Sequence, residues 1–465
     1  MDHMAVFNQP DSYPMLTQDI ETLTDTDRMV PLQWKILTIC LFALMVDGFD
    51  VYVMGILTPS IAADLNVQPS SLTWAFFAQQ AGLAVGAFAI GPLADRYGRR
   101  NCLALSTLGV GAFTIAAGFS ESVFELAALR CVGGLFMSGL LPSAITLATE
   151  YAPKRRQAGV ASTMLVGYTL GMTLTAGAAS LLVSGSDWRM LFWLGGGLGL
   201  AASLLVTIFA PESLQFMVRK NPRNPAIGQI VSQFQRTSPC SLKDIQWTFG
   251  SCAESHVASA GDLLMTGYRR PTVMLWSAQF STIGLSALFA SWASTFFLNG
   301  QGVSVANYAR VQALVALTAI AGTLFIGPLI QRFGPGRVMV PIFLGYAASI
   351  IAAGLFPFGN WASMIALAFQ YGFAAAGSAG LIVIAVQLYP PAMRAMGIGW
   401  CFGIGRVGAI VGPVLGGSLV ASDLSLPQIF AFIAILPFLT AIILLALSRS
   451  LSIASRQSRN IVGAA

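Results

Sequence analysis

The chain has 465 residues, of which 55% are hydrophobic and only 9% are charged, and its mean hydropathy is +0.72. This composition is typical of an integral membrane protein, so the net charge of +6 does not indicate a nucleic-acid partner. The first 30 residues carry six acids and lack a basic start followed by an apolar core, which predicts a solvated tail and not a signal peptide.

Twelve segments are apolar and long enough to cross a membrane as helices. A spanning segment must satisfy its own backbone hydrogen bonds, and these segments lack the alternation of a β-barrel. We therefore expect an all-α bundle of twelve transmembrane helices. The segments begin near residues 33, 72, 102, 124, 158, 189, 272, 306, 337, 361, 395 and 427.

The first apolar segment contains two carboxylates, Asp47 and Asp50. Asp47 lies roughly 20 Å along a helix from Trp34, near the middle of a hydrocarbon layer about 30 Å thick. Residues three apart share a helix face, so both acids can point into one polar cavity. Lipid cannot solvate charge at this depth, which predicts a functional site. The alternative is a tilted helix that leaves both acids near the membrane surface.

The basic residues predict the orientation of the chain. All but four of the 25 Lys and Arg fall in the tails or in loops that join even to odd segments. Because such residues accumulate on the cytoplasmic side, both termini are expected in the cytoplasm. The exceptions lie within segments or on the far side: Arg130, Arg189, Arg310 and Arg406.

The cysteines and histidines exclude other chemistry. No two cysteines form a CxxC pair, so we expect neither disulfides nor a metal site, and no cofactor. The two histidines, His3 and His256, lie in the tail and the central loop, which leaves no histidine for a proton relay in the membrane. The cysteines are Cys40, Cys102, Cys131, Cys240, Cys252 and Cys401.

The chain repeats itself. Residues 91–98, GPLADRYG, recur at 327–334 as GPLIQRFG, with five identities in eight at an offset of 236 residues. Parallel repeats of six segments are the layout of transporters whose solute site lies between the halves. We expect a tail at 1–30, a six-helix bundle at 31–211, a cytoplasmic loop at 212–270, a second bundle at 271–449 and a tail at 450–465. A second set of matches has an offset of 238 residues: Tyr151, Pro153, Arg156, Gly159 and Gly167 with Tyr389, Pro391, Arg394, Gly397 and Gly405.

The stretch 91–100, GPLADRYGRR, resembles the signature between the second and third helices of the major facilitator superfamily. Its acid and arginines can form a latch on the cytoplasmic side, with carboxylates at nearby helix ends as countercharges. The alternative is that these basic residues only set the topology. The expected cytoplasmic gate comprises Asp95, Arg96, Arg99, Glu150, Arg156 and Glu212.

More narrowly, the chain resembles the aromatic acid:proton symporter family. The matching stretches are 47–50 (DGFD), 130–150, 211–213 (PES) and 405–413 (GRVGAIVGP), and the resemblance as a whole runs over nearly all twelve segments. The resemblance implies import of a small aromatic carboxylate, such as a hydroxybenzoate, with protons across a bacterial inner membrane. The sequence departs from the family at Gln331, where Asp is usual, and at Ser143, where Asn is common.

The residues suggest how such a solute is held and coupled to protons. A carboxylate requires a cation, and only Arg130 and Arg406 lie deep in apolar segments. Arg406 is expected to contact substrate; the alternative is a packing bond to backbone carbonyls. Arg130 is ambiguous, since it can instead pair with Asp47 or Asp50. We expect these three to couple protons, with Asp50 as the carrier and Asp47 as the residue that orients it.

Aromatic and amide side chains in these segments suit an aromatic solute. Aromatic rings can stack on it and amides can bond its hydroxyl groups, although ordinary packing explains any single aromatic equally well. Besides Arg406, the expected substrate contacts are Gln370, Gln279, Trp292, Trp400 and Tyr52.

The sequence thus predicts a secondary transporter that works by alternating access, functions as a monomer in the lipid bilayer and binds no nucleic acid. One competing hypothesis is a proton-coupled exporter of drugs or organic anions on the same fold. A membrane enzyme or a channel is disfavoured, because there is no nucleotide loop, no His/Cys metal set and no Ser-His pair, and the repeat would go unexplained.

Overall fold

The computed structural model describes residues 17–20, 29–183, 187–235, 246–248, 263–265, 268–389 and 391–462. Twelve helical stretches of this part are long and apolar enough to cross a membrane, as the sequence predicted. Each begins within a few residues of its predicted start. The limits proposed for the bundles, loop and tails remain a prediction.

The described residues of the first half, up to the end of α8, form seven α-helices. The fourth spanning stretch is divided into α5 and α6 at Ser138–Gly139. The helices are α2 (Pro31–Asp64), α3 (Thr73–Tyr97), α4 (Arg99–Ala117), α5 (Val123–Met137), α6 (Leu140–Tyr151), α7 (Gln157–Leu182) and α8 (Arg189–Phe209).

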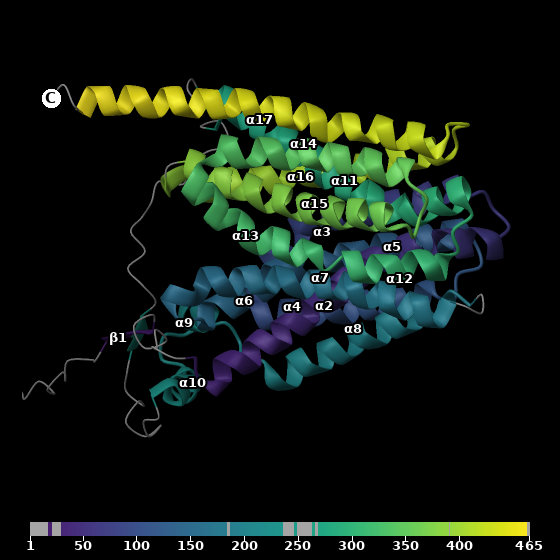
Figure 1. Cartoon of the computed structure of the whole chain (residues 1–465). Helices are drawn as coiled ribbons and strands as arrows, with labels where there is room; N and C mark the ends of the chain where they lie inside the picture. The colour runs from purple at the N-terminus through teal and green to yellow at the C-terminus, as the bar shows by residue number, and fades with distance from the viewer. Residues whose placement is uncertain are drawn as a thin grey trace, which may run out of the picture.

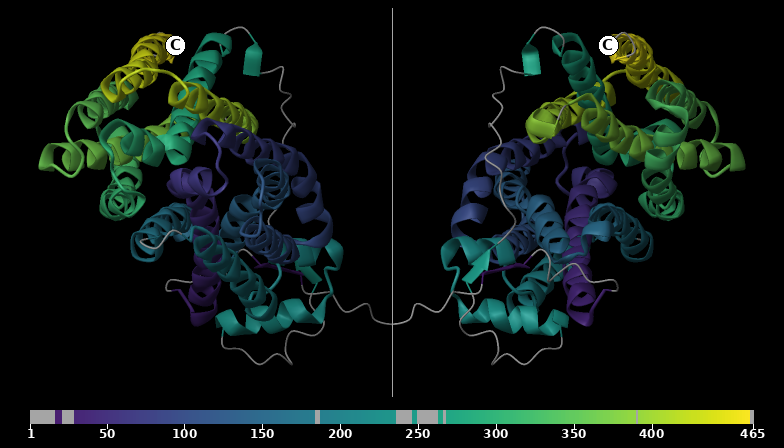
Figure 2. Two further views of the ribbon diagram at one scale, coloured as in Figure 1. Left: turned by 90° about the vertical axis from the view of Figure 1, so that its right-hand side faces the viewer. Right: turned by 90° about the vertical axis from the view of Figure 1, so that its left-hand side faces the viewer.

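The second half has the same layout. Its second spanning stretch is divided into α12 and α13 at Ala316–Leu317. The helices are α11 (Arg269–Gln301), α12 (Val305–Val315), α13 (Thr318–Phe333), α14 (Pro335–Leu355), α15 (Trp361–Leu388), α16 (Pro391–Val420) and α17 (Leu426–Val462). In Figure 2 the first half, purple to teal, and the second half, green to yellow, form two adjacent groups of helices.

The repeated sequence motif produces the same local structure in both halves. Gly98 ends α3 with φ +97° and ψ 157°, and Gly334 ends α13 with φ +85° and ψ 154°. A side chain is disfavoured at such positive φ, which explains the glycine in both copies. The preceding arginine also repeats its contact, since Arg96 lies over Tyr97 and Arg332 over Phe333.

One end of the molecule carries an additional small layer. It consists of α9 (Leu214–Lys220), α10 (Pro225–Gln235) and the parallel pair β1 (Thr17–Asp19) and β2 (Gln246–Thr248). Figure 1 shows this layer at the same end as the C-terminus. Because Gly98 and Gly334 also lie here, we call it the motif end. The fully buried Ile20 and Trp247 belong to the apolar cluster of the first half, which fixes the layer to that half.

The two halves bond to each other toward the opposite end. Ser294 on α11 donates a hydrogen bond of 2.6 Å to the Gly55 carbonyl on α2, and Thr58 donates one of 3.5 Å to Ser291. Within the described helices these are the hydrogen bonds between the halves. Gly55 is required here, because a Cβ atom at this position would lie 1.7 Å from the Ala290 carbonyl oxygen.

Candidate functional site

Asp50 is held by a buried network within the first half. Arg130 on α5 donates to both carboxylate oxygens, at 2.6 Å and 3.0 Å, and to the Asp50 carbonyl at 3.0 Å. Thr114 on α4 donates to the same carboxylate at 2.5 Å. Asp50 and Arg130 are 3% and 2% exposed, so this bidentate ion pair is buried among α2, α4 and α5. This contact answers the question that the sequence left open about the partner of Arg130.

Asp47 lies three residues away but has different surroundings. Its side chain is buried midway along α2. Within the described residues it forms no hydrogen bond or ion pair. Its electrostatic neighbours are Asp50 and, on the second half, Arg406. The two acids therefore share a helix face, as their spacing predicted, but only Asp50 has a fixed partner.

Arg406 is the cation that faces the first half. It is half-buried on α16, and it interacts electrostatically with Asp47 and Tyr168. Its guanidinium makes no hydrogen bond to backbone carbonyls in the described part of the chain, so the packing alternative is not observed. Arg406 and Asp47 thus form a charged centre across the boundary between the halves, although they are not in contact as an ion pair.

Two predicted amides have unused hydrogen-bonding groups. Gln279 is completely buried beside Gly405, the neighbour of Arg406, and neither its Oε1 nor its Nε2 has a partner. Gln370 is 4% exposed, and its Oε1 is also without a partner. A buried amide without hydrogen-bond partners is energetically costly. Such unpaired groups are expected in a binding site, where a ligand completes the hydrogen bonds.

The predicted aromatic contacts occupy three places. Tyr52 is half-buried near the charged centre, and its ring meets that of Tyr168 edge-on, with 6.4 Å between the centroids. Trp400 is 40% exposed and stacks on Trp276, six residues from Arg406 toward the motif end. Trp292 is fully buried near the opposite end, where its indole donates to Pro413. The structure therefore brings Tyr52 to the charged centre and places Trp292 apart from it.

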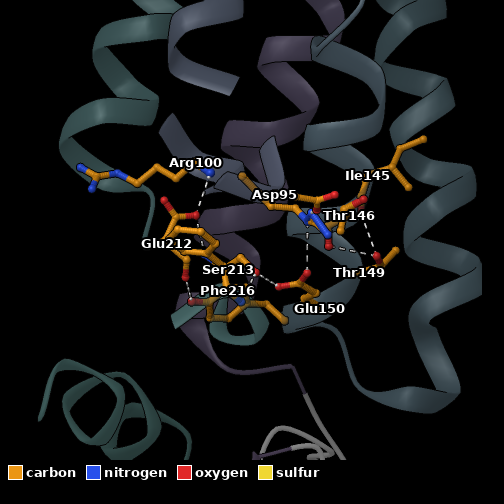
Figure 3. A network of polar contacts seen from close by, with 11 residues as sticks. Asp95, Arg100, Ile145, Thr146, Thr149, Glu150, Glu212, Ser213 and Phe216 are labelled. Atoms are coloured by element: carbon orange, nitrogen blue, oxygen red, sulfur yellow. Dashed lines mark hydrogen bonds and ion pairs between the residues drawn. The ribbon is translucent and has the colours of Figure 1, made fainter. Parts of the chain in front are cut away.

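A second polar network lies at the motif end (Figure 3). Arg99 is 3.4 Å from Asp95 and 3.6 Å from Glu150, whose other oxygen accepts a hydrogen bond from Ser213. Asp95 remains mostly exposed. This network joins α3, α4 and α6 to the start of α9, all within the first half.

Glu212 closes the same network from the other side. Its Oε1 accepts 2.9 Å hydrogen bonds from the backbone N–H groups of Arg100 and Ser213. A carboxylate placed against the first turn of α4 accepts from a backbone N–H group that the helix leaves free. Its negative charge also interacts favourably with the positive end of the helix dipole. Of the other predicted gate residues, Arg96 contacts the Tyr97 ring and Arg156 is exposed.

Sequence reasoning missed several of these partners. Thr114 is an ordinary hydroxyl residue in its segment. Ser213 belongs to the PES stretch at 211–213, but nothing in the sequence shows that it pairs with Glu150. Tyr168 aligns with Arg406 in the internal repeat, and this alignment was the one available signal for its position.

The described residues contain no cluster of three or more His, Cys, Asp and Glu side chains that can hold a metal ion. Cys40, Cys102, Cys131 and Cys401 are free thiols. Cys240 and Cys252 lie outside the described residues.

Twelve spanning helices in two halves, with a charged centre at their boundary, define the class of a multi-pass membrane transporter. The chain belongs to the Major Facilitator Superfamily, whose profile matches residues 40–309 and 275–461. This is a family of transporters, so the chain is not an enzyme.

Curated relatives refine this assignment. The chain is 31% identical to the 4-hydroxybenzoate transporter PcaK of Acinetobacter baylyi, over 90% of this chain and 91% of the relative. It is 29% identical to a gallate transporter of Pseudomonas putida, over 92% and 94%. The predicted resemblance to aromatic acid transporters of this superfamily is thereby confirmed.

Solved structures support the fold. A D-xylose-proton symporter superposes with a TM-score of 0.68 at 15% identity, covering 88% of this chain and 97% of that one. A bacterial homologue of the human lysosomal transporter Spinster, in an inward-facing conformation, gives 0.67 at 16% identity, covering 92% and 98%.

Proposed function

We propose that this chain imports a small aromatic carboxylate together with protons across a bacterial inner membrane, by alternating access. The observation that carries the proposal is Arg406, a half-buried cation at the boundary of the halves whose guanidinium has no hydrogen-bond partner in the described chain. A planar guanidinium matches the two oxygens of a carboxylate. The gallate and hydroxybenzoate relatives transport solutes of this class.

The orientation follows from the distribution of basic residues. Lysines and arginines are concentrated in the loops and tails of the motif end, so this end faces the cytoplasm and both termini lie there. The hydrogen bonds from α2 to α11 then lie toward the periplasm. In this proposal the periplasmic side, where α2 and α11 are hydrogen-bonded to each other, is the closed end of the transporter.

The charges in the centre explain coupling to protons. Without solute, the positive charge of Arg406 faces the negative charge of Asp47. A bound carboxylate adds a second negative charge to a region that lipid and buried side chains cannot solvate. A proton on Asp47 restores neutrality, so solute and proton are carried together.

Asp47 is therefore our candidate for the proton carrier, which reverses the order expected from the sequence. Asp50 accepts three hydrogen bonds from Arg130 and Thr114, and protonating it would remove the countercharge of a buried arginine. In this proposal the ion pair of Asp50 and Arg130 stabilises the packing of the first half, and Asp47 gains and loses a proton during transport.

The proposal also covers assembly and gating. We propose a monomer in the lipid bilayer as the functional unit, without a nucleic-acid partner, since Asp47 and Arg406 face each other from the two halves of a single chain. The network of Arg99, Glu150 and Glu212 keeps the cytoplasmic ends of the first half together while the halves rock.

The test is uptake of radiolabelled 4-hydroxybenzoate into proteoliposomes that contain the purified protein. We expect accumulation by the natural protein and its loss in Arg406→Ala. Arg310→Ala is the matched control, because Arg310 is an exposed arginine of the same half whose polar contact is with Asn307. Failure to accumulate any aromatic acid would contradict the proposal and favour the exporter.

A further inference from the structure

One face of α16 is directed at the first half of the molecule. Gly399, Arg406 and Gly417 are seven and eleven residues apart, close to two and three full turns of an α-helix, so they lie on the same face. At the closed end this face contacts the first half, since a Cβ atom on Gly417 would collide with the hydroxyl oxygen of Thr73 at the start of α3. Arg406 therefore lies on the face of α16 that meets the other half.

The space beside this face widens toward the motif end. Gly399 lies about 27 Å from Gly417 along the helix, and a Cβ atom on it would meet no atom of the described chain within 4 Å. Three other glycines of α16 differ, because an added Cβ atom would collide with α11: Gly405, Gly408 and Gly412. Close packing of helices thus explains these three glycines, whereas open space remains beside Gly399.

Phe402 borders this open space. It lies three residues after Gly399 and four residues before Arg406, on the same side of α16. Its side chain is 43% exposed and contacts no other aromatic ring of the described helices. The exposed valines of α16 lie roughly 120–180° around the helix from Phe402, on a different face. They are Val407, Val411 and Val414.

The side chain of Arg406 extends toward Phe402. Long side chains of an α-helix point back toward its N-terminus, over the residue four positions earlier. Because α16 begins at the motif end, this direction carries the guanidinium of Arg406 toward the level of Phe402. The Cβ atoms of residues four apart are separated by about 5–6 Å. A ring attached directly to a carboxylate on Arg406 therefore reaches Phe402 at the about 4.5–7 Å between ring centres at which aromatic rings attract each other.

We propose that Phe402 stacks on the ring of the solute, and that its spacing from Arg406 selects acids whose carboxylate is attached directly to the ring. This inference rests on the proposed function, in which Arg406 binds the carboxylate. An arylpropionate carries its ring two carbons further from the carboxylate. With the carboxylate on Arg406, that ring lies beyond Phe402, beside Gly399, where no side chain contacts it.

The test measures inhibition of the uptake of labelled 4-hydroxybenzoate by proteoliposomes. Benzoate and cyclohexanecarboxylate have rings of similar size, but only benzoate has an aromatic ring, and 3-phenylpropionate has the longer side chain. We expect the natural protein to bind benzoate roughly fivefold more tightly than either of the other acids, the effect of one good aromatic pair. Phe402→Leu should make the three inhibition constants similar by weakening benzoate alone. Unchanged inhibition by cyclohexanecarboxylate also shows that the variant is folded.

Phe438→Leu is the matched control, because Phe438 is an exposed phenylalanine of α17 in the same half. It should keep the preference of the natural protein for benzoate. Equal inhibition by benzoate and cyclohexanecarboxylate in the natural protein would overturn the role of Phe402 alone. An unchanged preference in Phe402→Leu, or equal weakening of all three acids in that variant, would do the same.

The length of the solute has its own outcome. Inhibition by 3-phenylpropionate as strong as that by benzoate in the natural protein would overturn selection by the spacing of Phe402 from Arg406. A natural protein that takes up no 4-hydroxybenzoate would overturn the proposed function, and this inference with it.

Discussion

Two acids on one helix face have different structural situations. Asp50 is enclosed by Arg130 and Thr114, whereas Asp47 faces Arg406 across the boundary of the halves. Their spacing predicts the shared face and the depth in the membrane. It does not predict the partners, because Arg130 lies 80 residues further along the chain and reaches Asp50 only through the packing of α5 against its neighbours.

Removing the carboxylate of Asp50 should destabilise the protein strongly. Asp50→Ala leaves the Arg130 charge buried without a partner, which typically costs about 3–5 kcal/mol. Arg189→Ala is the control, because the pair of Arg189 with Asp64 is partly exposed, with side chains 27% and 40% accessible, and pairs near the surface contribute about 0–1 kcal/mol. Thermal unfolding of the purified variants measures both effects, and similar losses in the two would contradict the structural role of Asp50.

Two glycines of α2 lie against different helices. Gly48 packs within the first half, whereas Gly55 lies at the contact with the second half. A Cβ atom on Gly48 would lie 2.0 Å from the Tyr168 carbonyl oxygen, inside the first half. A Cβ atom on Gly55 would meet Ala290 of the second half instead. The sequence shows that α2 is rich in small residues, but it does not show which glycine faces which helix.

Gly55→Ala should therefore open the closed end. In a chain whose natural cysteines are replaced, Ser294→Cys reports on that contact, since Ser294 is 3% exposed and bonds to Gly55. We expect faster labelling by a water-soluble thiol reagent when Gly55→Ala is added, and little change with Gly48→Ala. The same labelling rate in all three proteins would argue against closure at this point.

The start of α4 depends on a residue from another segment. Glu212 accepts from the Arg100 backbone and lies against Gly98, where φ is positive. Loss of a helix-capping group costs about 1–2 kcal/mol, so Glu212→Ala should lower the melting temperature. Glu212→Gln keeps an acceptor oxygen and should lower it less. Equal melting temperatures for these two variants would contradict the capping role.

The elements of this fold are readable from hydropathy to a large extent. Apolar length predicts all twelve spanning stretches, because the bilayer sets a minimum helix length. The breaks at Ser138–Gly139 and Ala316–Leu317 were not predicted, since hydropathy continues through both. They depend on local backbone geometry and on neighbouring helices.

At the scale of the whole molecule, the internal repeat predicts two halves but not the state in which they meet. The matching glycines at 98 and 334 reproduce the same helix end in each half. The closed end is formed by tertiary contacts of α2 with α11, which no local pattern encodes. For the same reason, the sequence identifies Arg406 and Asp47 separately as candidate site residues, but it does not show that they face each other.

The proposed orientation predicts the location of the chain ends. Green fluorescent protein fused after Ala465 should fluoresce in intact bacteria, because it folds in the cytoplasm, and alkaline phosphatase inserted at Gly302 should be active in the periplasm. Gly302 ends α11 at the opposite end of the molecule. Phosphatase activity from the C-terminal position would reverse the assigned orientation.

The most direct test of the account is accumulation of labelled 4-hydroxybenzoate in proteoliposomes under an inward proton gradient, comparing the natural protein with Asp47→Asn. The natural protein should accumulate the solute above its external concentration. Asp47→Asn should still exchange labelled for unlabelled solute across the membrane, but it should not accumulate it, since Arg406 remains and the proton carrier is gone. Gradient-driven accumulation that survives in Asp47→Asn would contradict the assignment of proton coupling to this charged centre.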